Sequence, residues 1–85
     1  MQYILVVFKS RNETLYLANI LLKQGFHVSV VNTPRELGKS CGISVKISEE
    51  LLQVVKHVLT MNPFRSFYGI FKIIIQKGKK SLIKL

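Results

Sequence analysis

The chain has 85 residues, of which 48% are apolar, so we expect one folded domain with a modest core rather than a disordered chain. No apolar run reaches the roughly 18 residues that a membrane-spanning helix needs, and no signal peptide is recognisable at Met1. A single cysteine excludes an internal disulfide and a cysteine-rich zinc site. We therefore expect a cytoplasmic protein without membrane span, metal or cofactor, in which Cys41 is a free thiol.

The first third of the sequence predicts a strand, a helix and a second strand. The β-branched and aromatic run 3–8 is too short for a buried helix and is typical of a strand. Ser10 or Asn12 can cap the helix that follows, and Gly25 ends it. Alternating apolar side chains in residues 27–31 then predict the second strand.

The rest of the sequence predicts strand, helix, strand and tail. Residues 43–47 alternate as a strand, Ser48 can cap a helix that ends at Asn62-Pro63, and residues 67–75 form an apolar strand. The order β-α-β-β-α-β is typical of an α+β, ferredoxin-like two-layer sandwich, with two helices on one face of a four-stranded antiparallel sheet. We expect residues 1–76 to form this domain and residues 77–85 to be a basic tail without regular structure.

The predicted sheet is apolar on both faces. In the strands 3–8 and 67–75, apolar residues point to either side, whereas helices cover only one face. The other face would then expose an apolar patch, which in soluble proteins usually marks an interface. We therefore expect a homodimer or a larger homo-oligomer.

Cys41 lies in a polar, glycine-bounded segment, Gly38-Lys39-Ser40-Cys41-Gly42. Cysteines within helices and strands are commonly small buried hydrophobes, but a surface loop of this composition favours a reactive thiol. The predicted topology brings Cys41 to one edge of the domain with the start of the first helix, and both a helix start and nearby cations favour the thiolate. The cations expected at this edge are Arg11, Arg35, Lys39 and Arg65.

Two short motifs carry a family resemblance. Thr33-Pro34-Arg35-Glu36 and Ser40-Cys41-Gly42-Ile43 resemble the Pro-Arg and Ser-Cys-Gly signature of the selenium/sulfur carrier protein-like family, and the order and spacing of elements are similar over about residues 2–75. The resemblance implies that Cys41 bears a persulfide or perselenide, that Pro34 and Arg35 shape the loop, with Ser40 beside the thiol, and that Gly42 gives a partner close access.

By this resemblance the protein is a carrier rather than a turnover enzyme. The Cys41 thiolate would take sulfur or selenium from a cysteine desulfurase or a selenium-donor protein and hand it to an acceptor protein. The basic tail is an addition to the family pattern.

A second hypothesis rests on charge. Residues 51–85 carry seven basic and no acidic side chains, and Tyr68 and Phe71 lie beside lysines on a predicted edge strand. Such a surface favours a basic adaptor that binds nucleic acid or an acidic protein, with Cys41 incidental. For most of the aromatic rings, packing in the core is a better explanation than stacking on nucleic-acid bases. The tail contacts to a polyanion would be Lys77, Lys79, Lys80 and Lys84.

Two other catalytic hypotheses, a phosphate-binding loop and a histidine base, are not supported by the sequence. Gly38-Lys39-Ser40 resembles the end of a phosphate-binding loop, but Thr33 stands where the first glycine is required. His27 and His57 are candidates for a base beside Cys41, yet the chain has no aspartate to orient either one. We expect both to be ordinary surface histidines.

Overall fold

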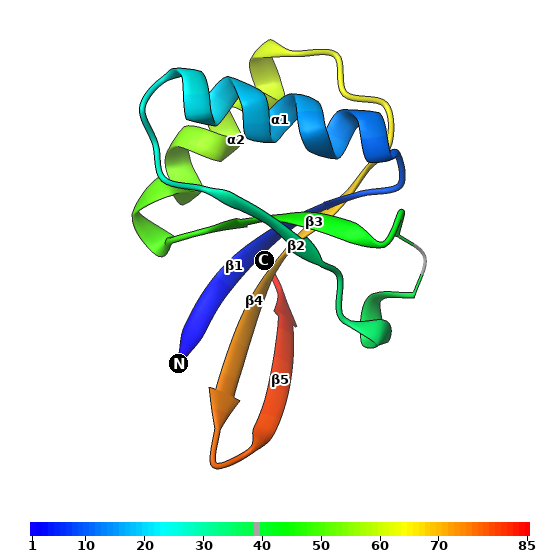
Figure 1. Ribbon diagram of the computed structural model, residues 1–85, viewed down its shortest axis with the longest axis vertical. Coiled ribbons are helices and arrows are strands. Elements are labelled where there is room, and N and C mark those ends of the chain that lie inside the picture. The colour runs from blue at the N-terminus through cyan, green and yellow to red at the C-terminus, as the bar shows by residue number, and fades with distance from the viewer. Residues whose placement is uncertain (39) are drawn as a thin grey trace.

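The computed structural model describes residues 1–38 and 40–85 and shows two helices on one side of an antiparallel sheet (Figure 1). The strands lie in the order β2-β3-β1-β4-β5. The α+β class is thus confirmed, with five strands in place of four. The elements in chain order are β1 (Gln2–Phe8), α1 (Arg11–Lys23), β2 (Ser29–Asn32), the 3₁₀ turn η1 (Arg35–Leu37), β3 (Ile43–Ile47), the 3₁₀ turn η2 (Glu49–Leu51), α2 (Leu52–Met61), β4 (Phe67–Gln76) and β5 (Lys79–Lys84).

Local signals set both ends of α1. Ser10 is the N-cap, and its side chain accepts a hydrogen bond from the Glu13 N–H at 3.3 Å. At the other end Gly25 adopts φ +88°, and the Phe26 N–H donates to the Leu21 carbonyl at 3.1 Å. A glycine in this left-handed conformation followed by an apolar residue is the usual way to close a helix.

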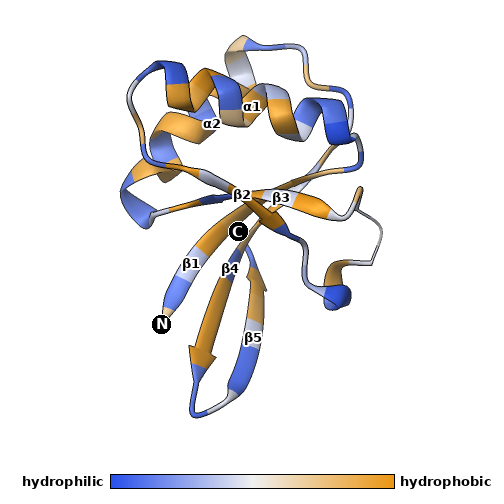
Figure 2. Cartoon of the chain, viewed as in Figure 1, coloured by the Kyte–Doolittle hydropathy of each residue, from blue (hydrophilic) through white to orange (hydrophobic). Residues whose placement is uncertain are grey.

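The main core lies between the sheet and the helices. Alternate residues of β1, namely Ile4, Val6 and Phe8, point toward the helices and are at most 1% exposed. Figure 2 shows the apolar stripes of both helices above this part of the sheet. The helix side chains buried against it include Leu17, Ala18, Leu21, Val55 and Val58.

The second face of the sheet is covered, contrary to our expectation. Leu5 and Val7 of β1 are fully buried on this face, and Ile73 of β4 is also fully buried. Leu37 of η1 packs on them and is itself 7% exposed, with Leu82 of β5 at the rim. The loop after β2 and the C-terminal strand thus supply side chains that the helices do not, which removes the exposed patch from which a homo-oligomer was predicted. The assembly itself stays a prediction.

The C-terminal residues form a strand, so the predicted unstructured tail is wrong. β5 pairs with β4 from Gln76 opposite Lys79 to Phe71 opposite Lys84, and β4 is therefore not an edge strand. Lys77 and Gly78 join the strands with φ of 50° and 77°. Positive φ at both central residues is the type I′ geometry that matches the twist of a two-residue hairpin.

The remaining boundaries differ from the predictions by a few residues. β2 begins at Ser29 rather than at residue 27, and η2 precedes α2 after Ser48. Within residues 1–38 and 40–85, no helix has both the length and the apolar character that crossing a membrane requires.

Candidate functional site

The segment between β2 and β3 is held at its base and at its middle. The Thr33 N–H donates to the Gly42 carbonyl at 2.9 Å, and the Thr33 hydroxyl bonds to the buried hydroxyl of Ser44. Leu37 anchors the middle of the segment in the second-face cluster. These contacts fix both ends of the loop that carries Cys41, which we call the thiol loop (residues 33–42).

Cys41 sits where the end of β1, the start of β3 and the first turn of α1 meet. Its N–H donates to the Phe8 carbonyl at 3.4 Å, and its side chain is partly buried. The sulfur donates to the Ile43 carbonyl at 3.4 Å and lies 3.5 Å from the Thr14 hydroxyl. The predicted position at the start of the first helix is confirmed by this contact.

Thr14 gives the sulfur a polar partner that the sequence did not reveal. Thr14 is fully buried, and its hydroxyl donates to the Ser10 carbonyl at 3.0 Å while facing Cys41. The Thr14 hydroxyl has one proton, which it gives to the Ser10 carbonyl, so it can donate to a thiolate at Cys41 only by turning away from Ser10. A thiolate cannot donate to the Ile43 carbonyl. The positive end of α1 favours negative charge at this point. The start of α1 therefore suits an anionic sulfur, and the Thr14 hydroxyl does so once it has turned.

Gly42 and Ser40 shape the backbone on either side of the thiol. Gly42 has φ +94°, and a Cβ built on it would have no atom within 4 Å. The requirement for glycine is therefore conformational, and the space beside it is open. Its N–H donates to the Ser40 hydroxyl at 3.2 Å. Pro34 precedes η1, and its carbonyl accepts a hydrogen bond from the Leu37 N–H at 3.0 Å.

The three predicted arginines are exposed on separate segments. Arg11 is the first residue of α1, Arg35 lies on η1, and Arg65 precedes β4. Lys39 lies outside the described residues. The hydrogen-bond partners of the Cys41 sulfur within residues 1–38 and 40–85 are Thr14 and Ile43, so a direct contact between the sulfur and these cations stays a prediction.

Glu13 ties the segment before β4 to the start of α1, which sequence reasoning also missed. Its carboxylate accepts the Arg65 N–H at 2.8 Å, the Ser66 N–H at 2.8 Å and the Ser66 hydroxyl at 2.6 Å. Hydrogen bonds from Arg65 and Ser66 lower the pKa of Glu13 below its ordinary value of 4.5.

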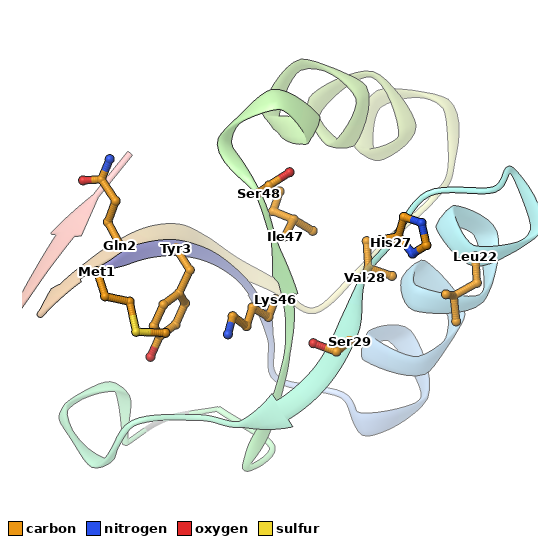
Figure 3. Close-up of a pocket in the computed structure, with 10 residues that line it drawn as sticks. All are labelled: Met1, Gln2, Tyr3, Leu22, His27, Val28, Ser29, Lys46, Ile47 and Ser48. Atoms are coloured by element: carbon orange, nitrogen blue, oxygen red, sulfur yellow. The ribbon is translucent and has the colours of Figure 1, made fainter.

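The histidines lie elsewhere. His27 lines a shallow pocket of about 480 Å³ at the other end of the sheet, where Lys46 contacts the ring of Tyr3 (Figure 3). His57 is exposed on α2. Among the described residues, no three His, Cys, Asp or Glu side chains form a group that could hold a metal ion.

Comparison with known proteins places the chain in a family. None of the curated proteins and none of the solved structures is significantly similar to it. A family model described as "Putative Se/S carrier protein-like" matches residues 3–68, which is more than half of the chain. The match includes the whole thiol loop and Cys41, and it ends inside β4. The chain therefore belongs to the selenium/sulfur carrier protein-like family.

Proposed function

We propose that this protein is a sulfur or selenium carrier in which the Cys41 thiolate holds a persulfide or a perselenide. One observation carries the proposal. The only cysteine of the chain lies beside the Thr14 hydroxyl and the start of α1, within the residues that the family model matches. A thiolate rather than a thiol is the sulfur nucleophile, and the positive end of α1 lies on the side of Cys41 where the negative charge would form.

The loading step transfers one sulfur atom without net oxidation. The Cys41 thiolate attacks the terminal sulfur of a donor protein's cysteine persulfide. A new S–S bond forms at Cys41, the S–S bond of the donor breaks, and the donor cysteine leaves as a thiolate. For selenium, the transferred atom is the terminal selenium of a perselenide.

The unloading step has the same chemistry in reverse order. A thiolate of the acceptor protein attacks the terminal atom on Cys41, and Cys41 leaves as a thiolate. Because the chain contains a single cysteine, a loaded Cys41 has no internal thiol that would displace the cargo. A donor such as a cysteine desulfurase and a separate acceptor are thus both part of the proposal.

Intact mass spectrometry tests the proposal. After incubation with a cysteine desulfurase and cysteine, the protein should gain the mass of one sulfur atom, and a thiol reductant should remove it. Cys41→Ser should fold and gain nothing, since serine is nearly the same size. If the native protein is not loaded, or if Cys41 reacts with an alkylating reagent only after unfolding, the carrier function is excluded.

A further inference from the structure

The edge strand β5 carries three cations within six residues. Lys79, Lys80 and Lys84 are exposed on it, and residues 51–85 contain no acidic side chain. The hairpin of β4 and β5 projects beyond the helices (Figure 1). β5 is the last strand of the sheet, so one side of its backbone has no neighbouring strand in the described chain.

The free backbone groups of β5 belong to alternate residues. The Leu85 N–H donates to the Ile70 carbonyl of β4 at 2.8 Å. Because successive residues of an antiparallel strand bond to opposite sides, Ile83 and Ser81 also face β4. The outward N–H and C=O groups are therefore those of Lys80, Leu82 and Lys84.

A strand added at this edge would meet different chemistry on its two faces. On the second face of the sheet it would lie beside the side chains of Lys80 and Lys84, which stand opposite Ile75 and Phe71. On the helix face it would lie beside Ile83, which is 46% exposed. Near the end of β5, exposed Phe67 and Leu85 line a groove of about 420 Å³ that continues this apolar surface.

Lys84 is held in place at this edge. Its side chain passes close to Gly69, where an added Cβ would lie 3.3 Å from the Lys84 Cε. Its ammonium group lies 5.9 Å from the centre of the Tyr68 ring, and that of Lys9 lies 6.0 Å from the same ring. Two ammonium groups thus lie near one aromatic ring and add to the positive charge at this end of β5.

We propose that β5 binds an extended acidic segment of a partner protein, which adds a sixth strand to the sheet. Asp or Glu at alternate positions of the segment would face Lys80 and Lys84, and apolar residues between them would lie against Ile83. Strand addition of this kind gains affinity from main-chain hydrogen bonds and specificity from alternate side chains. This inference goes beyond the carrier function and does not depend on Cys41.

Two other occupants fit the edge less well. In a second copy paired antiparallel about Leu82, β5 would place Lys80 opposite Lys84, and like charges directly opposite each other destabilise a strand pair. A single-stranded nucleic acid would need free aromatic rings for stacking. Phe71 is only 7% exposed, and the Tyr68 ring is already contacted by Phe71 and two lysines.

The probe for this proposal is a fluorescein-labelled peptide of alternating Glu and Val, measured by fluorescence anisotropy. We expect saturable binding that weakens with salt, and slowed hydrogen exchange at the amides of Lys80, Leu82 and Lys84 in the complex. Lys80→Glu with Lys84→Glu should weaken binding about tenfold or more, because two attractive cross-strand pairs become repulsive. Cys41→Ser should bind the peptide unchanged, which separates this test from that of the carrier function.

A control variant, a control peptide and a competing oligonucleotide test the proposal further. Lys23→Glu with Lys46→Glu changes the net charge equally on α1 and β3, away from β5, and should weaken binding about twofold at most. A peptide of the same composition with Glu and Val in separate blocks should bind worse than the alternating one. Equal loss in the control variant, equal binding of the block peptide, unchanged amide exchange, or tighter binding of oligothymidylate would each overturn the proposal. Melting temperatures of both double variants verify that they are folded.

Discussion

The thiol loop and the β4–β5 hairpin are held in place by different kinds of contact. The thiol loop has little regular structure and is fixed by individual contacts, from Thr33 to Gly42, from Cys41 to Phe8 and from Leu37 to the second-face cluster. The hairpin is fixed by a continuous strand ladder and a two-residue turn. Single substitutions should therefore disturb the thiol loop more than the hairpin.

The two regions also differ in what they present to a partner. The thiol loop presents one reactive atom whose position must be accurate, whereas β5 presents a row of backbone groups and lysines that tolerate small shifts. The family match covers the thiol loop and ends at residue 68, near the start of β4 and before the turn and β5. This division suggests that the chemistry and the recognition of a partner can be altered separately.

The largest expected effect is that of Leu37→Ala. It removes the apolar anchor of the thiol loop, which is 7% exposed, and should lower the free energy of unfolding by about 2 to 3 kcal/mol. Denaturant unfolding measures the loss. The matched change Leu22→Ala, at a site that is 54% exposed on α1, should cost far less. Equal losses at the two sites would mean that Leu37 is not an anchor.

Gly42→Ala should have the next largest effect. At φ +94° an alanine strains the backbone, although the surrounding space is open, and we expect a loss of about 1 to 2 kcal/mol with slower sulfur loading. Gly38→Ala is the control, because Gly38 has φ −59° and a Cβ there would make an ordinary 3.5 Å contact. If both variants are equally stable, the conformation of Gly42 does not matter.

Two regions could be predicted from the sequence, because each carries a clear local signal. The strand 43–47 was located to the residue, and the segment of Cys41 was identified from its glycines and its Ser-Cys-Gly motif. The hairpin was missed for a physical reason: Lys79, Lys80 and Ser81 do not alternate, and a lysine in a type I′ turn gives no glycine or asparagine signal at its first position.

The partners of Cys41 were missed for a different reason. Thr14 and Ile43 contact the sulfur because α1 packs over the sheet at a particular height, and local sequence does not carry that information. The covering of the second face has the same origin. Leu37 follows the charged residues Arg35 and Glu36, and only the path of the loop brings it under β1.

Thr14→Val changes the thiol site and leaves the β4–β5 hairpin unchanged. Valine has nearly the shape of threonine but cannot donate to a thiolate, so sulfur loading and alkylation at neutral pH should slow several-fold, equivalent to about 1 kcal/mol. Peptide binding at β5 should be unchanged. Thr60→Val, at an exposed position of α2, is the control. If loading of Thr14→Val equals that of the wild type, the hydroxyl has no role at the sulfur.

The smallest expected effect is the pH dependence set by Glu13, which holds the segment leading into β4 against α1. Its pKa is lowered in the folded state by hydrogen bonds from Arg65 and Ser66, so the carboxylate stabilises the fold above the ordinary value of 4.5 and this contribution is lost as the pH falls through the lower, folded value. The melting temperature of the wild type should therefore exceed that of Glu13→Gln at neutral pH, and the two curves should converge in acid. Glu36→Gln, at an exposed position of η1, should follow the wild type throughout. Parallel curves for Glu13→Gln and the wild type would show that the hydrogen bonds to the carboxylate contribute no measurable stability.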